Sequence, residues 1–189
     1  VDFATGRAWV EWSDNTATFT REVFVSRVTD AVFLRIRSNT PGSVSCYVAL
    51  NRAQNEQLAE VGHSDSKRGD IDLEASREAS LDDQTVSFSG RYPNGQSFAA
   101  EGQVVTVGGT LDEADGQLEV KGADEVLLQV RLALAGTCDP VEPVAFDAAF
   151  ADHTALHTEL FNRATLTLGQ DQPQSNEEML MAAYDGDVP

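Results

Sequence analysis

Two histidines four residues apart are the first residues whose types and spacing could do chemistry. His153 and His157 occur in DHTALHTELF, where a helix places both imidazoles on one face, at the spacing of paired metal ligands. The glutamate of the zinc-protease motif is missing between them, and no third ligand is indicated. Two histidines where a helix packs on a sheet are more often ordinary packing residues. We therefore expect no metal and no cofactor in this chain.

Neighbouring carboxylates form the second group. Asp112, Glu113 and Asp115 lie close together in the sequence, as do Asp82 and Asp83. An inverting glycosidase needs two carboxylates facing each other across a cleft, roughly 6.5–9.5 Å apart. Adjacent acids at a hairpin tip do not meet that need. We interpret both groups as solvated turn residues, with a calcium site at the first tip as the alternative, and expect no catalytic residue here.

Aromatic side chains offer a third possibility, because their faces can stack on the apolar faces of sugar rings. Trp9, Trp12 and Tyr92 are the sugar-contact candidates, with Tyr47 as a further aromatic residue. Trp9 and Trp12 are three residues apart, so a strand directs them to opposite faces and at most one can contact a ligand. Packing of these aromatic residues in the core is the favoured interpretation.

The composition bounds the class of protein. The chain has 189 residues, is 41% hydrophobic and carries a formal net charge of −18, so it can bury a core but repels phosphate backbones. Nucleic acid and anionic membranes are therefore not expected partners, and no stretch approaches the roughly 20 apolar residues of a membrane span. Cys46 and Cys138 could form one disulfide, but two small apolar side chains are the favoured interpretation.

The elements that must position these residues are almost all strands. Period-two alternation and β-propensity predict about ten short strands over residues 1–135, among them 1–12, 31–38, 71–76 and 85–91. Turns are predicted at Asp14-Asn15, Pro93-Asn94-Gly95 and Asp115-Gly116. Gly108-Gly109 is interpreted as a bulge or hairpin device, and 122–124 as a turn. Residues 51–69 read as a long polar loop. This pattern predicts a mainly β protein, a large antiparallel β-sandwich (super-sandwich).

A helix follows the strands late in the chain. Asp147 is the expected N-cap of a helix whose apolar face holds residues 150, 153, 157, 160 and 161. A short strand is predicted over 164–168, then a capping box at Ser175 and Glu178 opening a helix over 176–184. We divide the chain into a sandwich domain, 1–169, and the start of a helical linker, 170–189.

Several stretches, in order, resemble the N-terminal β-sandwich of glycoside hydrolase family 95, the α-L-fucosidase-like enzymes. They are Thr20–Ser26 with Asp30–Ile36, Pro41–Ser45, Val120–Val126, the set His153, Leu160, Phe161, Arg163 and Leu166–Gly169, and Ser175–Leu180. His157 stands where that family usually has tyrosine. Together these stretches cover nearly the whole chain.

The resemblance implies a sandwich packed on an (α/α)6 catalytic barrel through a helical linker. Such enzymes hydrolyse terminal α-L-fucosides or α-L-galactosides with inversion, and their acid and base lie in the barrel. No catalytic residue can therefore be carried onto this chain, and residues 1–189 alone are predicted to be inactive. The chain resembles an internal segment of a longer polypeptide, with fucosyl or galactosyl glycans as partners of the intact enzyme and a secreted or periplasmic location.

Two other functions remain open at this stage. One is a stand-alone carbohydrate-binding sandwich, which the aromatic residues and the acidic surface suggest. The other is the sandwich domain of a related disaccharide phosphorylase, whose intact enzyme would depend on phosphate.

Overall fold

The computed structural model describes residues 1–51, 74–164 and 175–185. The described part of the chain contains eight strands and two helices. They are β1 (Arg7–Ser13), β2 (Thr18–Ser26), β3 (Ala31–Ser38), β4 (Val44–Val48), β5 (Glu74–Ser80), β6 (Thr85–Arg91), β7 (Ser97–Ala114), β8 (Gln117–Ala133), α2 (Phe146–Phe161) and α3 (Asn176–Asp185).

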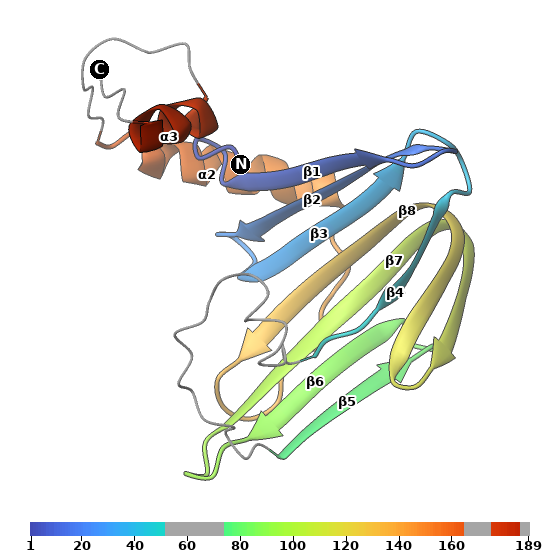
Figure 1. The fold of residues 1–189 in the computed structure, drawn as a ribbon. Coiled ribbons are helices and arrows are strands. Elements are labelled where there is room, and N and C mark those ends of the chain that lie inside the picture. Colours follow the sequence, from blue (N-terminus) through green and yellow to red (C-terminus); the bar gives the residue numbers. More distant parts are fainter. Residues whose placement is uncertain (52–73, 165–174, 186–189) are drawn as a thin grey trace.

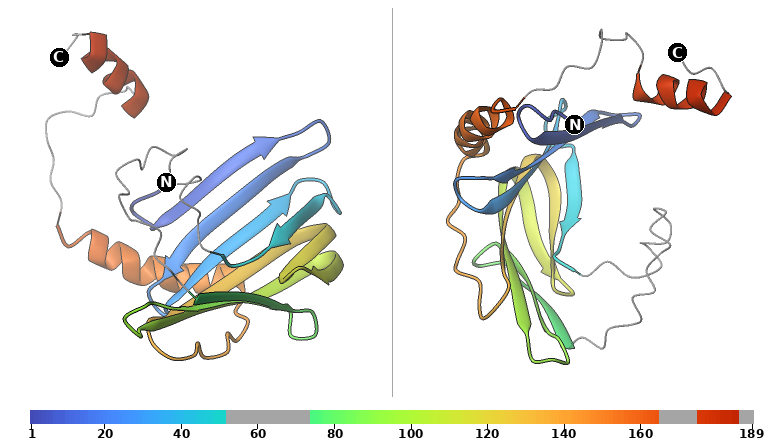
Figure 2. Two further views of the ribbon diagram at one scale, coloured as in Figure 1. Left: turned by 60° about the horizontal axis from the view of Figure 1, so that its bottom comes forward. Right: turned by 90° about the vertical axis from the view of Figure 1, so that its left-hand side faces the viewer.

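The strands form an antiparallel sheet in the order β1-β2-β3-β8-β7-β6-β5, and β4 pairs with β8 off this path (Figure 1). Strand β8 belongs to two layers. Its first part, from Leu118 to Ala123, pairs with β4, whereas its second part, from Glu125 to Val130, pairs with β3. β4 lies over one face of the sheet and α2 over the other (Figure 2, right). The predicted β-sandwich is confirmed.

A glycine pair bends the long β7–β8 hairpin over the sheet. The register of β7 against β8 shifts between Val107 and Gly108, so the predicted bulge is present. Gly108 and Gly109 have φ values of +69° and +72°. The turn predicted at 122–124 is wrong, because β8 continues through these residues. A bulge lets two paired strands bend together without ending either one, which is why fewer and longer strands replace the ten expected.

We predict that Gly109→Ala destabilises the fold more than Gly95→Ala. Both glycines have positive φ, so alanine at either costs about 1–2 kcal/mol of backbone strain. A Cβ at Gly109 would also lie 2.5 Å from the Lys121 carbonyl oxygen, whereas one at Gly95 meets nothing within 4 Å. Urea unfolding of the two variants should show a further loss of about 1–3 kcal/mol for Gly109→Ala. Equal losses would show that the bend has room for a side chain.

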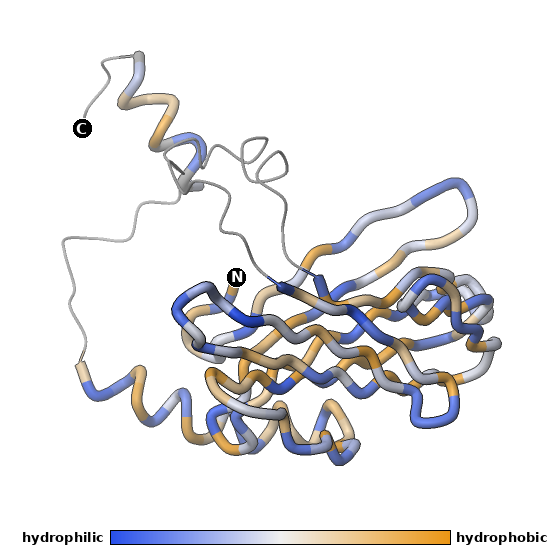
Figure 3. Tube along the Cα trace, turned by 90° about the horizontal axis from the view of Figure 1, so that it is seen from below, coloured by the Kyte–Doolittle hydropathy of each residue, from blue (hydrophilic) through white to orange (hydrophobic). Residues whose placement is uncertain are grey.

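Two hydrophobic clusters lie on opposite faces of the sheet. Adjacent residues of β8 divide between them, since Val126 contributes to the cluster between the layers and Leu127 to the cluster beneath α2. The first also contains Val44, Val86, Val104, Leu118 and Val120, and the second Phe24, Phe33, Phe146 and Ala149. Hydrophobic residues follow the strands, while hydrophilic residues gather at the hairpin tips (Figure 3).

The N-terminus of α2 differs from the prediction, whereas the N-terminus of α3 agrees with it. α2 begins after Ala145 without a side-chain cap, so Asp147 is not the N-cap as predicted. Asp147 lies in the first turn, where its carboxylate binds Arg35 of the sheet at 2.9 Å, a stronger partner than a backbone N–H. The capping box is confirmed, with Ser175 N–H donating to Glu178 Oε2 at 2.8 Å and Glu178 N–H to Ser175 Oγ at 3.2 Å.

Some predictions fall outside the described residues. These are the polar loop beyond Asn51, the start of the strand predicted from Ile71, the strand over 165–168, and most of the linker. Within the described ranges, no helix is long and apolar enough to cross a membrane.

Candidate functional site

The histidine pair, His153 and His157, ties the N-terminal segment (residues 1–6) to α2. His153 Nε2 lies 3.0 Å from the carbonyl oxygen of Thr5, and His157 Nε2 lies 2.9 Å from that of Phe3. The rings are 5.2 Å apart. The pair thus joins two parts of the chain separated by about 150 residues, which the helical spacing alone did not indicate.

Arg27, in the turn between β2 and β3, holds the other nitrogen of each ring. Its backbone N–H donates to His153 Nδ1 at 3.4 Å, and its side-chain Nε donates to His157 Nδ1 at 3.2 Å. A carbonyl oxygen can only accept and an arginine N–H can only donate. Each imidazole must therefore be neutral, with its proton on Nε2 and its lone pair on Nδ1.

This arrangement leaves neither histidine free for chemistry. A metal ligand or a general base needs an imidazole lone pair, and both Nδ1 lone pairs accept hydrogen bonds from Arg27. Nor does the described part of the chain contain a group of three histidine, cysteine or acidic side chains that could hold a metal ion. The geometry gives the pair a packing and hydrogen-bonding role.

A hollow of about 500 Å³ adjoins the pair, lined by Gly6, Val25, Ser26, Arg27, Asp30 and the two imidazoles. Gly6 is required there, because its φ is +65° and an added Cβ would lie 2.9 Å from His153 Nε2. His153 itself is only 2% exposed. Burial lowers its pKa below the ordinary 6.5; the hydrogen bond to Thr5 opposes this shift, and His157 and Arg27 add to it.

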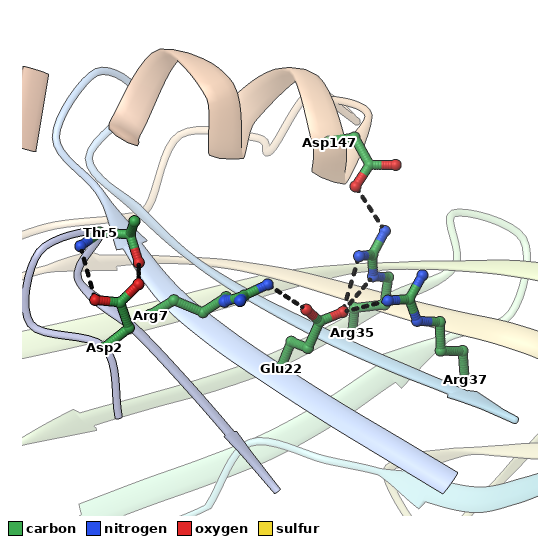
Figure 4. Close-up of polar contacts among 7 residues, drawn as sticks. All are labelled: Asp2, Thr5, Arg7, Glu22, Arg35, Arg37 and Asp147. Carbon is green, nitrogen blue, oxygen red and sulfur yellow. Dashed lines mark hydrogen bonds and ion pairs between the residues drawn. The ribbon is translucent and has the colours of Figure 1, made fainter. Parts of the chain in front are cut away.

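The N-terminal segment is a turn and not the strand predicted from Val1. The Asp2 carboxylate accepts a hydrogen bond from the Thr5 hydroxyl at 2.6 Å (Figure 4) and another from the Ala4 N–H at 3.0 Å. An aspartate that bonds the following N–H groups competes with strand pairing. The strand therefore starts at Arg7, which closes the turn by a β-bridge to Asp2.

A buried ion cluster links the sheet to the start of α2 (Figure 4). Glu22 is 3% exposed, and its Oε2 accepts from Arg35 Nε at 3.0 Å and Nη2 at 2.8 Å. Arg7 Nη1 binds the other carboxylate oxygen at 3.0 Å, and Arg37 Nη2 lies 3.3 Å from Oε2. Arg35 also reaches Asp147 of α2 at 2.9 Å, so the charge of the helix start is paired with the sheet.

Sequence reasoning missed this cluster, although one signal was present. Glu22 is in phase with Phe24 and Ser26, both buried, so period two places its carboxylate on the covered face of β2. Burial lowers the pKa of Arg35, but hydrogen bonds and charge attraction from Glu22 and then Asp147 outweigh it and raise the pKa. The arginine therefore remains charged beneath the helix.

The three sugar-contact candidates do not form one platform. Trp9 and Trp12 lie on β1 at one edge of the sheet, whereas Tyr92 follows β6, next to the opposite edge. Arg7 lies 5.1 Å from the Trp9 ring, on the α2 side, while Trp12 stacks on Phe19 at 5.4 Å, on the other face. The predicted division of the two tryptophans between faces is confirmed. The predicted packing in the core is wrong, because β1 is an edge strand that leaves Trp9 48% and Trp12 41% exposed. Their contact with sugar stays a prediction.

The remaining candidates occupy turns and surfaces. Asp112 at the β7–β8 tip binds Lys121 at 3.3 Å, and Asp83 in the β5–β6 turn accepts from Ser80 at 2.9 Å. Cys46 and Cys138 are free thiols, and burial raises the pKa of both. Cys138 lines an open groove of about 700 Å³ over β5, β6 and β7, whose floor includes Ser76 and Ser89.

Most of the chain is similar to known proteins in sequence or in fold. Residues 1–135 match the sequence model of the family described as glycosyl hydrolase family 65, N-terminal domain. The fold is similar to the solved structure of a human-microbiome protein assigned as a kojibiose phosphorylase, with a TM-score of 0.51 and 6% identity. That likeness covers 85% of this chain but 24% of the other. No sequence among curated proteins matches the chain.

Proposed function

The chain belongs to the family of glycosyl hydrolase family 65 N-terminal domains, and from this premise we propose that it is the non-catalytic sandwich of a disaccharide phosphorylase. In this proposal the sandwich packs beside an (α/α)6 catalytic barrel of the same polypeptide. The barrel supplies the reacting groups, and phosphate cleaves the disaccharide into a sugar 1-phosphate and a free sugar. The family match over residues 1–135 carries the assignment as an N-terminal sandwich, and the similar fold of a protein assigned as a kojibiose phosphorylase favours phosphorolysis over hydrolysis.

The polar groups of the described fold support a structural role for this segment. The most buried carboxylate, Glu22, is held by three arginines, and the buried His153 has both ring nitrogens in hydrogen bonds. A catalytic carboxylate or imidazole needs access to a reacting proton. Neither group has such access here.

The family differs from the one that the sequence resembles. The match to family 65 does not support the predicted membership of family 95 or the predicted α-L-fucosidase activity. It does support the broader prediction of an N-terminal sandwich of a carbohydrate-active enzyme. The quoted stretches explain the difference, because Thr20–Ser26 and Asp30–Ile36 are a strand pair and Pro41–Ser45 includes a turn. Alternation and turn chemistry recur wherever a sandwich forms, so they identify the fold before the family.

Exposed apolar side chains support an interface. Phe3 is 74% exposed and Phe161 is 46% exposed, and both adjoin His157, Phe3 through its carbonyl oxygen and Phe161 through its ring. Large apolar side chains that gather on a surface are typical of contact with another domain. In our proposal the catalytic barrel covers them.

The test is phosphate-dependent cleavage by the intact polypeptide. Purified enzyme is incubated with glucose disaccharides of different linkage, with and without inorganic phosphate, and the sugar phosphate and free sugar are quantified. We expect cleavage only with phosphate, and none from residues 1–189 alone. Hydrolysis that ignores phosphate would overturn the phosphorylase proposal, and activity of residues 1–189 alone would overturn the non-catalytic role.

A stand-alone carbohydrate-binding sandwich is the second candidate, favoured by the exposure of Trp9 and Trp12 on β1. The same preparation of residues 1–189 can be titrated with these disaccharides by calorimetry. Heat of binding that is lost in Trp9→Ala or Trp12→Ala would favour this candidate, and its absence would favour the scaffold.

A further inference from the structure

We propose that His153, His157 and Arg27, here called the histidine latch, form a pH-sensitive device that holds the N-terminal segment on α2 near neutral pH and releases it in acid. The latch is a conformational device of this domain, so it does not depend on the identity of the reaction. Its action follows from which atoms can donate and which can accept.

Protonation of the rings would prevent both Nδ1 atoms from accepting hydrogen bonds. In the neutral rings these atoms accept from the Arg27 backbone N–H and from its Nε. A proton added at Nδ1 points a donor at a donor, so each hydrogen bond is lost. It also places a positive ring beside the Arg27 guanidinium, and the second protonation adds a positive ring 5.2 Å from the first.

The other charges around the latch do not compensate fully. Asp30 lines the same hollow, but within the described residues it makes no hydrogen bond or ion pair with either ring. Asp2, on the N-terminal segment, uses its carboxylate for Ala4 and Thr5. Arg7, at the start of β1, is positive and paired with Glu22. Among the described residues that line the hollow, Asp30 is the one carboxylate that could favour charged rings, and it is opposed by Arg27 and by the neighbouring ring.

The direction of the pH dependence follows from burial. The pKa of His153 in the folded protein lies below its ordinary value of 6.5, so the released form binds the proton more tightly. The latch therefore contributes its full stability above pH 6.5 and loses it as the pH falls through this value toward the lowered pKa.

Release should be local. The carbonyl oxygens of Thr5 and Phe3 accept hydrogen bonds from the two imidazoles. The Thr158 hydroxyl of α2 also donates to the Ala4 carbonyl oxygen at 3.0 Å. The helix itself is held independently by the Glu22 cluster and by the rings around Phe24. Acid thus opens the segment while the sandwich remains folded.

Hydrogen exchange of the full 189-residue chain tests the latch. Amide exchange in a peptide covering 2–7 is measured at pH 7.5 and 5.5 and corrected for intrinsic rates. We expect protection to fall on the order of tenfold in acid, because the two hydrogen bonds that Arg27 donates to the rings are lost. The double variant His153→Gln/His157→Gln, whose amides can still donate but cannot titrate, should show no such change. His63→Gln, which alters the one other histidine of the sequence, should behave as the wild type.

Unchanged protection in the wild type, or an undiminished acid response in the double variant, would overturn the proposal. A measurement on the unaltered protein makes the test independent of whether the variant folds. Nitrogen NMR of the imidazoles at pH 8 should show both rings of the latch protonated at Nε2, and lowering the pH should show His153 gaining its second proton below its ordinary pKa of 6.5. Protonation at Nδ1 at pH 8, or titration of His153 above that value, would equally refute the latch.

Discussion

Replacing Glu22 by glutamine should lower the free energy of unfolding by about 3–5 kcal/mol, because it removes the buried counter-charge of the buried Arg35. Glu22 and Arg35 have side chains only 4% and 7% exposed, and Arg35 donates twice to one carboxylate oxygen. Glutamine keeps the shape, but one of the two oxygens that accept from Arg7, Arg35 and Arg37 becomes an amide nitrogen, which can only donate. Urea unfolding followed by circular dichroism measures the loss.

A matched control exists on the surface of α2. Glu159 pairs with Arg163 at 2.7 Å, and both side chains are more than 60% exposed, at 63% and 66%. Glu159→Gln should cost only about 0.3–0.5 kcal/mol, since water screens an exposed pair one helical turn apart. Similar losses in the two variants would show that the buried cluster gives no more than a surface pair.

Truncating Phe24 to alanine should cost about 3–5 kcal/mol by a different route, the loss of packing. Phe24 is 2% exposed, and its ring stacks on Phe33 at 5.0 Å and meets Phe146 edge-on at 5.1 Å. It also contacts Phe150 and His153. Removing the ring leaves a cavity between the sheet and α2 that rigid neighbours cannot fill.

Phe3→Ala serves as the control for this loss. Phe3 is 74% exposed, and its bond to His157 comes from the backbone carbonyl, which alanine keeps. Its unfolding free energy should stay within about 0.5 kcal/mol of the wild type. Thermal unfolding by calorimetry can confirm both values, and a Phe24→Ala loss below 1.5 kcal/mol would mean that the helix collapses onto the sheet.

Three groups of contacts, at successive positions along α2, hold the helix on the rest of the domain. Arg35 holds Asp147 in the first turn, Phe24 packs against the middle, and the histidine latch ties the later turns to the N-terminal segment. Of these three, only the histidine latch depends on hydrogen bonds accepted by imidazole nitrogens, which protonation at Nδ1 would break. Acid should therefore affect one end of the helix attachment, while the Glu22 and Phe24 variants affect the stability of the whole domain.

The sequence by itself determined the strands, the hairpins and much of the helix face. Period two placed β3 and β6 at the residues predicted, because in a half-buried strand the covered face must be apolar. The Asn94-Gly95 and Asp115-Gly116 turns form as expected, since these residues tolerate positive φ. Sequence patterns suffice for these strands and turns, because each depends on residues that are close together in the chain.

Only the tertiary structure decided the roles of the charged and titratable residues. Glu22 reads as a surface residue until Arg35, 13 positions away, and Asp147, 112 positions beyond Arg35, are brought together by β2, β3 and α2. His153 and His157 resemble metal ligands until Arg27 and the N-terminal carbonyls fix their protons. A buried polar group is defined by partners that the fold supplies, and those partners come from parts of the chain that no local pattern relates.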